Sequence, residues 1–520
     1  MQYTDEDDIQ VQQRIRYGYD VLGQCISQQI DDHRPMAFSY DKIGRLTEQR
    51  LTPSLSHHLS YSAAGQLAGY QTRRKGMVWS ETDYFYDQHG NLTQREDSRQ
   101  GSERYHYDVL GQIVGYQDPL GTLHRYRYDA CGDRFSTVAD NAEGRHTQHD
   151  NGTAYQLDKA GQLVSRTDRF SQLALRWNTF GRLAGIKNEH HDHAYTYDAL
   201  GRRVGKRHLQ RPTKLLDGLR VIDKETPSRG EPVWQDETWF MWDGDVMVGE
   251  LQREVAPRVV TPETWDKPDG IVYSGQFYVY QPDSFEPRAL QRYQQIAEAE
   301  DGEIAPLGEE QIYFYQNDPN GMPIRLQDGE GEVVWEAQFT PFGQLSVTGT
   351  SQLRQPLRMQ GQYYDTESGL HYNRYRYYDP ACGVFISQDP IGLKGGLNPY
   401  QFAVNTLGWV DPLGLTGIIY LRTDRRSGRE YIGKSKNQQT YEKRKKAHDR
   451  KAKKNDPTHQ GYNFVELEQS IVGADPLAKA EEDWIRAGEG PTGVNGAGLE
   501  NERHEMNDDR YANNGGCMKK

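Results

Sequence analysis

Two aspartates late in the chain have the spacing and neighbours of a paired acid–base site. Asp389 and Asp411 lie 22 residues apart, and each begins a sequence Asp-Pro-x-Gly-Leu. Two carboxyl groups held together away from water share a proton, so one acts as an acid and the other as a base toward a water molecule. The alternative is that both sequences are plain turns, because Asp, Pro and Gly are the residues that turns favour.

The charge of the chain changes directly after the second of these sequences. Residues 1–415 carry 42 Lys and Arg against 58 Asp and Glu, a net charge of −16, whereas residues 416–520 carry 20 against 17, a net charge of +3. Within this tail, residues 422–454 hold 14 basic and 4 acidic residues. A basic segment of this kind is typical of a protein that binds polyanions, although a solvated helix face gives the same pattern.

A repeat of the form Tyr-Asp-x-x-Gly-x-Leu fills much of the acidic part. Its Asp-equivalent positions are 20, 41, 62, 87, 108, 129, 158, 178 and 198. Alternating aromatic residues predict a strand, the Asp can bond its own backbone to start a turn, and the Gly supplies a positive φ. One hairpin cannot bury a face, so neighbouring copies should pair into a continuous sheet in which Tyr and Asp are structural. Residues 288–300 differ, since Leu290, Tyr293 and Ile296 predict a short helix.

The array resembles the YD-repeat shell of Rhs proteins and of toxin-complex C subunits, in which a β-sheet spirals into a hollow cocoon. The stretch from Tyr363 to Leu415 is similar to the end of the Rhs core, through Arg374-Tyr375-Arg376-Tyr377-Tyr378-Asp379-Pro380 and the closing Asp411-Pro412-Leu413-Gly414-Leu415. The resemblance implies aspartyl self-cleavage of the bond between Leu415 and Thr416. We therefore expect a YD-repeat shell over residues 1–355, a core end with the cleavage motif over 356–415, and a separate domain over 416–520.

The tail has the element order of a small α/β domain. Residues 418–421 and 430–433 predict two strands joined by a hairpin turn, and residues 441–454 and 478–487 predict two helices. Arg444 and His448 are four residues apart and therefore share a helix face, as do Glu481 and Ile485.

This order resembles that of the GIY-YIG nucleases. By that resemblance Tyr420 and Tyr431 are the tyrosines of the two strand motifs, and the other catalytic residues are Arg444, His448, Glu481 and Asn495. The first motif reads Ile-Ile-Tyr here, because Gly417 stands one place before Ile418 and is out of register.

The resemblance implies metal-dependent hydrolysis of phosphodiester bonds. Glu481 would hold Mg²⁺, or another divalent cation such as Mn²⁺, through oxygen. Tyr420, helped by Tyr431 or His448, would act as the general base, and Arg444 would bind the scissile phosphate. The nucleic-acid backbone would be gripped by Lys434, Lys443, Lys445 and Lys446.

Each of these residues also has a structural reading. Tyr420 and Tyr431 could be packed strand residues, Glu481 a helix-surface charge, His448 an exposed side chain, and Asn495 a turn former.

The chain as a whole therefore predicts a mainly β, cocoon-like shell followed by a small α/β nuclease domain. No run of 18 apolar residues predicts a transmembrane helix, residues 1–10 do not form a secretory signal, and the four cysteines lack the spacing of a zinc site. The resemblance implies an antibacterial effector, exported with a type VI secretion spike and chaperone and neutralised by a cognate immunity protein.

Such an effector is made in the producer's cytoplasm and cuts nucleic acid, DNA in preference to RNA, in the target cell's cytoplasm. The alternative is a surface interaction or adhesion protein with a non-catalytic tail.

Overall fold

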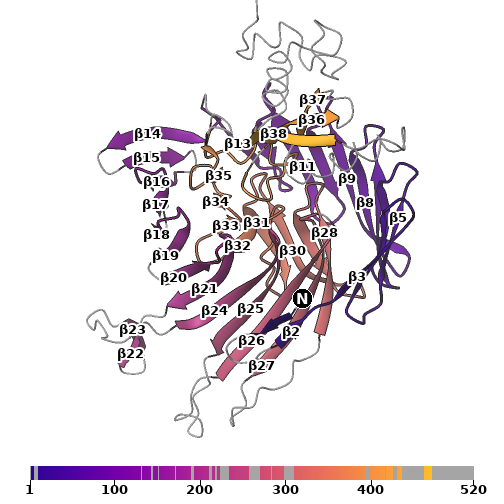
Figure 1. Cartoon of the computed structure of the whole chain (residues 1–520), viewed down its shortest axis with the longest axis horizontal. Helices are drawn as coiled ribbons and strands as arrows, with labels where there is room; N and C mark the ends of the chain where they lie inside the picture. The colour runs from indigo at the N-terminus through magenta and orange to yellow at the C-terminus, as the bar shows by residue number, and fades with distance from the viewer. Residues whose placement is uncertain are drawn as a thin grey trace, which may run out of the picture.

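The structure is a computed structural model of the chain. It describes residues 2–4, 10–129, 132–141, 144–149, 152–169, 171–188, 192–209, 213–216, 219–222, 234–256, 270–282, 284–297, 310–392, 398–415, 417–424, 430–435 and 462–470. Within these ranges the regular elements are β-strands in antiparallel sheets, and no α-helix occurs (Figure 1). The prediction of a mainly β chain is confirmed for this part.

Two large sheets carry the repeats, and both run in simple sequence order. The first has eleven strands: β3 (Ile15–Tyr19), β4 (Cys25–Ile30), β5 (Met36–Tyr40), β6 (Leu46–Arg50), β7 (Leu55–Tyr61), β8 (Leu67–Arg74), β9 (Met77–Tyr86), β10 (Leu92–Asp97), β11 (Gly101–Tyr107), β12 (Ile113–Gln117) and β13 (Leu123–Arg125).

The second has sixteen: β14 (Phe135–Asn141), β15 (Gly144–His149), β16 (Ala154–Leu157), β17 (Leu163–Thr167), β18 (Gln172–Trp177), β19 (Leu183–Lys187), β20 (Asp192–Tyr197), β21 (Arg203–Leu209), β24 (Trp234–Asp243), β25 (Val246–Ala256), β26 (Gly270–Tyr280), β27 (Pro287–Ala297), β28 (Glu310–Asn317), β29 (Pro323–Gln327), β30 (Val333–Phe339) and β31 (Leu345–Ser351).

Smaller sheets complete the described elements. Two hairpins are formed by β1 (Gln2–Thr4) with β2 (Gln10–Gln12), and by β22 (Thr213–Leu216) with β23 (Leu219–Ile222). A four-stranded sheet has β32 (Tyr363–Asp365), β33 (Leu370–Asn373), β34 (Arg376–Asp379) and β35 (Val384–Phe385). A three-stranded sheet has the order β37 (Glu430–Ser435), β36 (Gly417–Asp424), β38 (Tyr462–Ser470).

The turn of each repeat is closed by its aspartate and glycine, as the sequence predicts. At Asp108, Oδ1 accepts hydrogen bonds of 2.9 Å from the backbone N–H groups of Leu110 and Gln112, and Gly111 has φ of 80°. The backbone N–H of Gly111 also donates to the Asp108 carbonyl. We call these loops, together with the other hairpin turns on the same edge of each sheet, the repeat turns. They all lie on one edge of their sheet, because every second hairpin connection reaches the same edge.

In most copies an aromatic residue precedes the aspartate and bonds to the preceding hairpin. The hydroxyl of Tyr107 donates to the carbonyl of Leu92 at 2.7 Å, and the same bond recurs at five further repeat tyrosines. In a degenerate copy Trp177 replaces the tyrosine, and its indole N–H donates to the Leu163 carbonyl at 2.7 Å. Most copies therefore use an aromatic ring with a polar hydrogen at its tip, although Leu157 stands at this position before Asp158.

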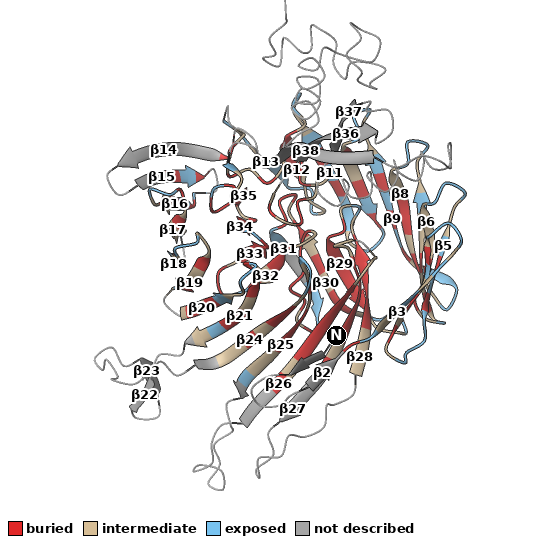
Figure 2. Cartoon of the chain, viewed as in Figure 1, coloured by how far each residue is buried: buried red, intermediate tan, exposed pale blue. Residues whose placement is uncertain are grey.

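The segment of residues 356–415, here called the end segment, packs against the second sheet. One core cluster joins Leu163 and Leu183 to Tyr372 and Tyr377, and a second joins strands β26 to β30 to Phe385 and Phe402. Strands β26 to β29 show long buried stretches in Figure 2, and the other face of β26 to β28 packs against the first sheet. Figure 1 shows β32 to β35 enclosed by the second sheet.

The predicted helix at residues 288–300 is wrong over residues 288–297, which belong to β27; residues 298–300 lie outside the described residues. Ala289 packs toward the first sheet, while the neighbouring Leu290 packs toward the end segment. A strand that is buried on both faces loses its polar–apolar alternation. The apolar spacing of Leu290, Tyr293 and Ile296 therefore mimicked a helix.

The end segment is joined to the second sheet by a fully buried ion pair. Both nitrogens of the Arg203 guanidinium bond to the Asp365 carboxylate, at 2.6 and 3.1 Å, and both side chains are 0% exposed. The guanidinium carbon lies 4.6 Å from the ring centre of Phe240 and 4.5 Å from that of Tyr372. The planar ion is therefore bonded to a carboxylate through its two Nη atoms and covered by rings on its faces, while its Nε has no hydrogen-bond partner among the described residues.

We predict that Arg203→Leu lowers the free energy of unfolding by about 3 kcal/mol, because it strands the buried Asp365 carboxylate. The matched control is Arg202→Leu, which removes a half-buried arginine paired with Asp198 and should cost about 0.5 kcal/mol. Urea unfolding of the two variants measures the difference. Equal losses would contradict the importance of the buried pair.

Candidate functional site

Asp389 and Asp411 each occupy the aspartate position of a turn built like the repeat turns. The Gly392 N–H donates to the Asp389 carbonyl at 2.9 Å, and Oδ1 of Asp389 accepts from Ile391 N–H at 3.0 Å. Oδ1 of Asp411 accepts from the backbone N–H of Leu415 at 2.7 Å. In both residues the backbone contact uses Oδ1, and Oδ2 is left for another partner.

The guanidinium of Arg376, on β34, lies between the two carboxylates. Its Nη2 is 3.2 Å from Oδ2 of Asp389 and 3.6 Å from Oδ2 of Asp411. Asp389 is 5% exposed, and Arg376 and Asp411 are each 1% exposed. The predicted meeting of the two aspartates is thus found in the structure, in an environment from which water is nearly excluded. Among the described residues, Oδ2 of Asp411 accepts no hydrogen bond.

Burial controls the ionisation of this group of three. It raises the pKa of Asp411 from 3.8 to about 6, against the attraction of Arg376, and the charge of Asp389 raises it further. Burial also raises the pKa of Asp389, again opposed by Arg376, and it lowers the pKa of Arg376. One positive charge therefore serves two carboxyl groups, which favours a state with a single proton between them.

A second copy of the sequence Asp-Pro-Leu-Gly, at residues 118–121, shows what the turn does by itself. Oδ1 of Asp118 accepts from the N–H groups of Leu120 and Thr122, as in the repeat turns. This turn lies at the surface, where Leu120 is 88% exposed. Burial of Asp118 is slight, and hydrogen bonds from His124 and the backbone lower its pKa. The turn is common to both places, and the raised pKa at Asp411 comes from burial beside Asp389.

The residues before the predicted cleavage point are held by the turn between β33 and β34. The side-chain amide of Asn373 donates to the Asp411 carbonyl at 2.9 Å, and the N–H of Tyr375 donates to the Leu413 carbonyl at 3.3 Å. Nε of Arg376 donates to the Gly414 carbonyl at 2.7 Å. Three of the five carbonyls of residues 411–415 are thus fixed. Leu415 is described, whereas Thr416 lies outside the described residues.

Sequence reasoning missed the role of Arg376, although it quoted the run that contains it. A usable signal was present. Tyrosines flank Arg376 in the sequence, and a charge buried among aromatic residues requires a counter-ion. Only the fold shows which two of the many carboxylates provide it.

In the tail, the two strands predicted from residues 418–421 and 430–433 are confirmed as β36 and β37. In the backbone register, Tyr420 is opposite Gly433 and Tyr431 is opposite Arg422. Positions 420 and 422 are two residues apart in one strand and therefore share a face of the sheet. Position 431 pairs with position 422, so positions 420 and 431 share that face as well. Lys434 lies on β37.

Most of the other predicted nuclease residues lie outside the described residues. This applies to both predicted tail helices and to Arg444, His448, Glu481, Asn495, Lys443, Lys445 and Lys446. The described residues contain no group of three side chains suited to hold a metal ion. They also contain no helix long and apolar enough to cross a membrane.

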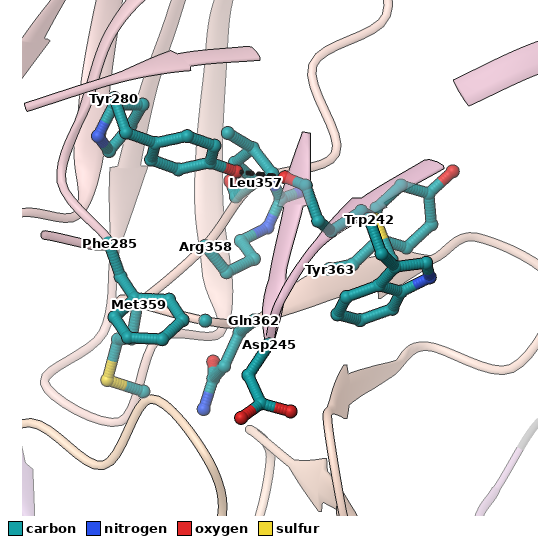
Figure 3. Close-up of a pocket in the computed structure, with 12 residues that line it drawn as sticks. Trp242, Asp245, Tyr280, Phe285, Leu357, Arg358, Met359, Gln362 and Tyr363 are labelled. Atoms are coloured by element: carbon teal, nitrogen blue, oxygen red, sulfur yellow. Dashed lines mark hydrogen bonds between the residues drawn. The ribbon is translucent and has the colours of Figure 1, made fainter. Parts of the chain in front are cut away.

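Two cavities border the end segment. The one in Figure 3 has a volume of about 20 Å³ and is lined by Trp242, Asp245 and Gln362 among others, which is room for about one water molecule. The other, of about 500 Å³, is lined by side chains of both charge signs, such as Lys206 and Glu367, which pair with each other at 3.1 Å. Neither offers the unbalanced charge that would select a ligand.

The fold has known counterparts. Residues 4–149 and 80–211 match the family model described as Teneurin YD-shell, and residues 312–348 match that of RHS protein. A crystal structure of TcdB2-TccC3-TEV aligns with a TM-score of 0.52 at 18% identity, covering 77% of this chain and 20% of that chain. The large antiparallel sheets are therefore those of a YD-repeat shell.

Two curated relatives extend the match. The chain is 30% identical over 370 residues to "Double-stranded DNA deaminase toxin A" of Burkholderia cenocepacia, covering 66% of this chain and 23% of the relative. It is 28% identical over 364 residues to "Probable deoxyribonuclease RhsA" of Dickeya dadantii, covering 68% and 21%. The chain is thus homologous to Rhs toxins, and it spans less than a quarter of the length of these two relatives.

We predict that Asp411 makes the end segment less stable as the pH rises. Its folded pKa of about 6 lies above the ordinary value of 3.8, so its contribution is present below about pH 4 and lost through about pH 6. In a chain ending at Leu415, we compare the free energy of unfolding of Asp411→Asn with that of the same chain without the substitution. This difference should shift by about 3 kcal/mol in favour of Asp411→Asn when the pH is raised from about 4 to about 8. Urea unfolding at both pH values tests this, and a constant difference would contradict the raised pKa.

Proposed function

We propose that this chain is part of an Rhs-type antibacterial effector, in which a YD-repeat shell carries a C-terminal endonuclease and releases it by cutting the Leu415–Thr416 bond. The observation that carries the cleavage is the buried group of Asp389, Arg376 and Asp411 directly before that bond.

In the proposed reaction the two aspartates have different roles. Arg376 lies nearer to Asp389, so it favours the ionised form of that residue, while Asp411 keeps the shared proton. Asp389 takes a proton from a water molecule as the water oxygen attacks the carbonyl carbon of Leu415. Asp411 gives its proton to the nitrogen of Thr416. The C–N bond breaks, leaving a carboxylic acid on Leu415 and an amine on Thr416.

We predict that the purified chain yields a tail fragment of roughly 12 kDa, judged from its share of the 59.8 kDa chain. Asp389→Asn and Asp411→Asn should both leave a single full-length band, because each removes one half of the acid–base pair. The matched control is Asp118→Asn, which alters the same Asp-Pro-Leu-Gly sequence at the surface and should cleave normally. A full-length band from the unchanged chain, or cleavage by Asp411→Asn, would exclude the mechanism.

The proposed nuclease part rests on the residues of the tail. One relative is named for a DNA deaminase and the other for a deoxyribonuclease, so similarity over the repeats does not determine the chemistry of a tail. The support comes from the order Tyr420, Tyr431, Arg444, Glu481, Asn495 and from the register that places positions 420 and 431 on one face.

In this proposal the divalent cation, Mg²⁺ or Mn²⁺, would be held by Glu481 and would neutralise charge on the phosphate. Tyr420, with Tyr431 or His448, takes the proton of the attacking water, and Arg444 binds the phosphate oxygens through two N–H groups. Asn495 would orient the site. Lys434 and the lysines of residues 443–446 contact the backbone of the nucleic acid, so that binding weakens with salt.

DNA is the proposed substrate, in keeping with the deoxyribonuclease name of the Dickeya relative. A cognate immunity protein, a secretion spike and a chaperone are the proposed partners, and the target-cell cytoplasm is the proposed place of action.

We predict that residues 416–520 nick supercoiled plasmid in the presence of Mg²⁺. Glu481→Ala should lower the rate by about a hundredfold or more, because the site loses the ligand of its charge-neutralising ion. The matched control is Glu482→Ala, which removes the adjacent carboxylate and should retain the rate. Intact DNA and RNA with every divalent cation tried would refute the nuclease and favour a non-catalytic tail.

A further inference from the structure

The turn between β33 and β34 has a backbone conformation that its residue does not favour. Asn373 and Arg376 pair across the hairpin, so Arg374 and Tyr375 form a two-residue loop. Arg374 has φ of 52°, in the left-handed region where glycine usually stands in such loops. An arginine there costs backbone strain, so its side chain must supply interactions that glycine lacks.

The side chain of Arg374 connects this loop to two repeat turns of the second sheet. Its Nη1 and Nη2 donate to the carbonyls of Gly201 and Leu200, at 3.1 and 3.0 Å, and its Nε donates to Oδ1 of Asp245 at 2.8 Å. Leu200 and Gly201 belong to the turn between β20 and β21, and Asp245 to the turn between β24 and β25. The side chain of Arg374 is 4% exposed, although that of Asp245 is 46% exposed.

The two repeat turns are also bonded to each other without involving the end segment. Nη1 of Arg202 donates to the Gly244 carbonyl at 2.9 Å, and its Nε bonds to Asp198 at 2.7 Å. Arg374 therefore bonds to a pair of turns that has its own connection. The three hydrogen bonds of Arg374 can form together only when both turns have reached their final positions.

The other side of the same loop holds the residues just before the proposed cleavage bond. Asn373, Tyr375 and Arg376 bond to the carbonyls of residues 411, 413 and 414, and Arg376 also carries the charge that both aspartates face. A two-residue loop is short, so a change in Arg374 is passed directly to these three neighbours. The repeat turns and the cleavage geometry are thus linked through four consecutive residues.

We propose that Arg374 is a positioning residue that couples cleavage to closure of the repeat turns, so that the chain is cut only after the second sheet has formed around the end segment. The proposal rests on the self-cleavage proposed above. Arg374 does not touch the reacting atoms. It sets the position of Arg376, and through it the positions of Asp389, Asp411 and the Gly414 carbonyl.

The test follows cleavage of the full chain during cell-free synthesis, with the time of appearance of the tail fragment read on gels. Resistance of the remainder to protease is read in the same samples. Arg374→Ala should slow cleavage by between about tenfold and a hundredfold, as expected for a misplaced reacting group, with protease resistance appearing on time. Arg374→Lys should cleave at a rate between those of Arg374→Ala and the unchanged chain, because a lysine can reach Asp245 but lacks the two Nη donors that bond to the carbonyls of Leu200 and Gly201. The matched control is Arg45→Ala, which removes the corresponding arginine–aspartate pair from a turn of the first sheet and should cleave at the rate of the unchanged chain.

Two further readouts separate positioning from general stability. The pH profile of cleavage in Arg374→Ala should keep its midpoint while its rate falls, because the titrating groups are unchanged. The double variant Arg374→Ala with Asp245→Asn should be no slower than Arg374→Ala, because the two residues act through one contact.

The outcomes distinguish this inference from its basis. No cleavage in the unchanged chain would refute self-cleavage itself. Cleavage of Arg374→Ala at the unchanged rate would refute the coupling and leave self-cleavage standing. If Arg374→Ala gives no protease-resistant product, the Asp245→Asn variant is used instead, because the half-exposed side chain of Asp245 tolerates the substitution. Slower cleavage of Asp245→Asn than of the unchanged chain would support the coupling. Cleavage of Asp245→Asn at the unchanged rate would overturn it.

Discussion

The hydrogen bonds that an aspartate makes to backbone N–H groups of its own turn are the interaction on which this structure depends. They let each hairpin reverse within four residues, with glycine supplying the positive φ. In most copies the aromatic residue before the aspartate then bonds to the hairpin before it, which connects those copies to their predecessors. A large antiparallel sheet results from one local rule applied many times. The same rule places Asp389 and Asp411, whose second oxygens stay available for chemistry.

Buried charge is the second organising feature. The end segment meets the second sheet through ion pairs with little exposure, such as Arg203 with Asp365 and Arg166 with Asp379. Such pairs add little net stability over apolar packing, but an incorrect register leaves a charge unpaired. They therefore select one docking position for the end segment. The site at Arg376 differs because one guanidinium faces two carboxylates, and burial, with a further contribution from the charge of Asp389, raises the pKa of Asp411.

Local patterns in the sequence predicted what local physics determines. The repeat turns, the sheet order, β36 and β37 follow from spacing and turn residues. The matching turns of Asp389 and Asp411 were also predictable from their matching sequences, whereas Asp118 shows that this sequence alone does not determine whether the aspartate is buried beside another. The strand β27 was not, because burial on both faces removed its alternation. Arg376 and Arg374 were missed because their partners lie far away in sequence, in turns that only the assembled sheet brings to the same place.

The bond from Leu415 N–H to Asp411 has a consequence for the state after a cut. Hydrolysis would place a new carboxylate on Leu415, one residue from the Gly414 carbonyl that Arg376 already holds. Three acidic groups would then crowd around a single guanidinium in a space nearly closed to water. Repulsion among these groups would raise the pKa of the new carboxyl group and would favour movement of the cut chain end away from Arg376. The cut would therefore open its own site, and religation would be prevented by departure of the amine with the tail and by loss of the geometry that held the chain end.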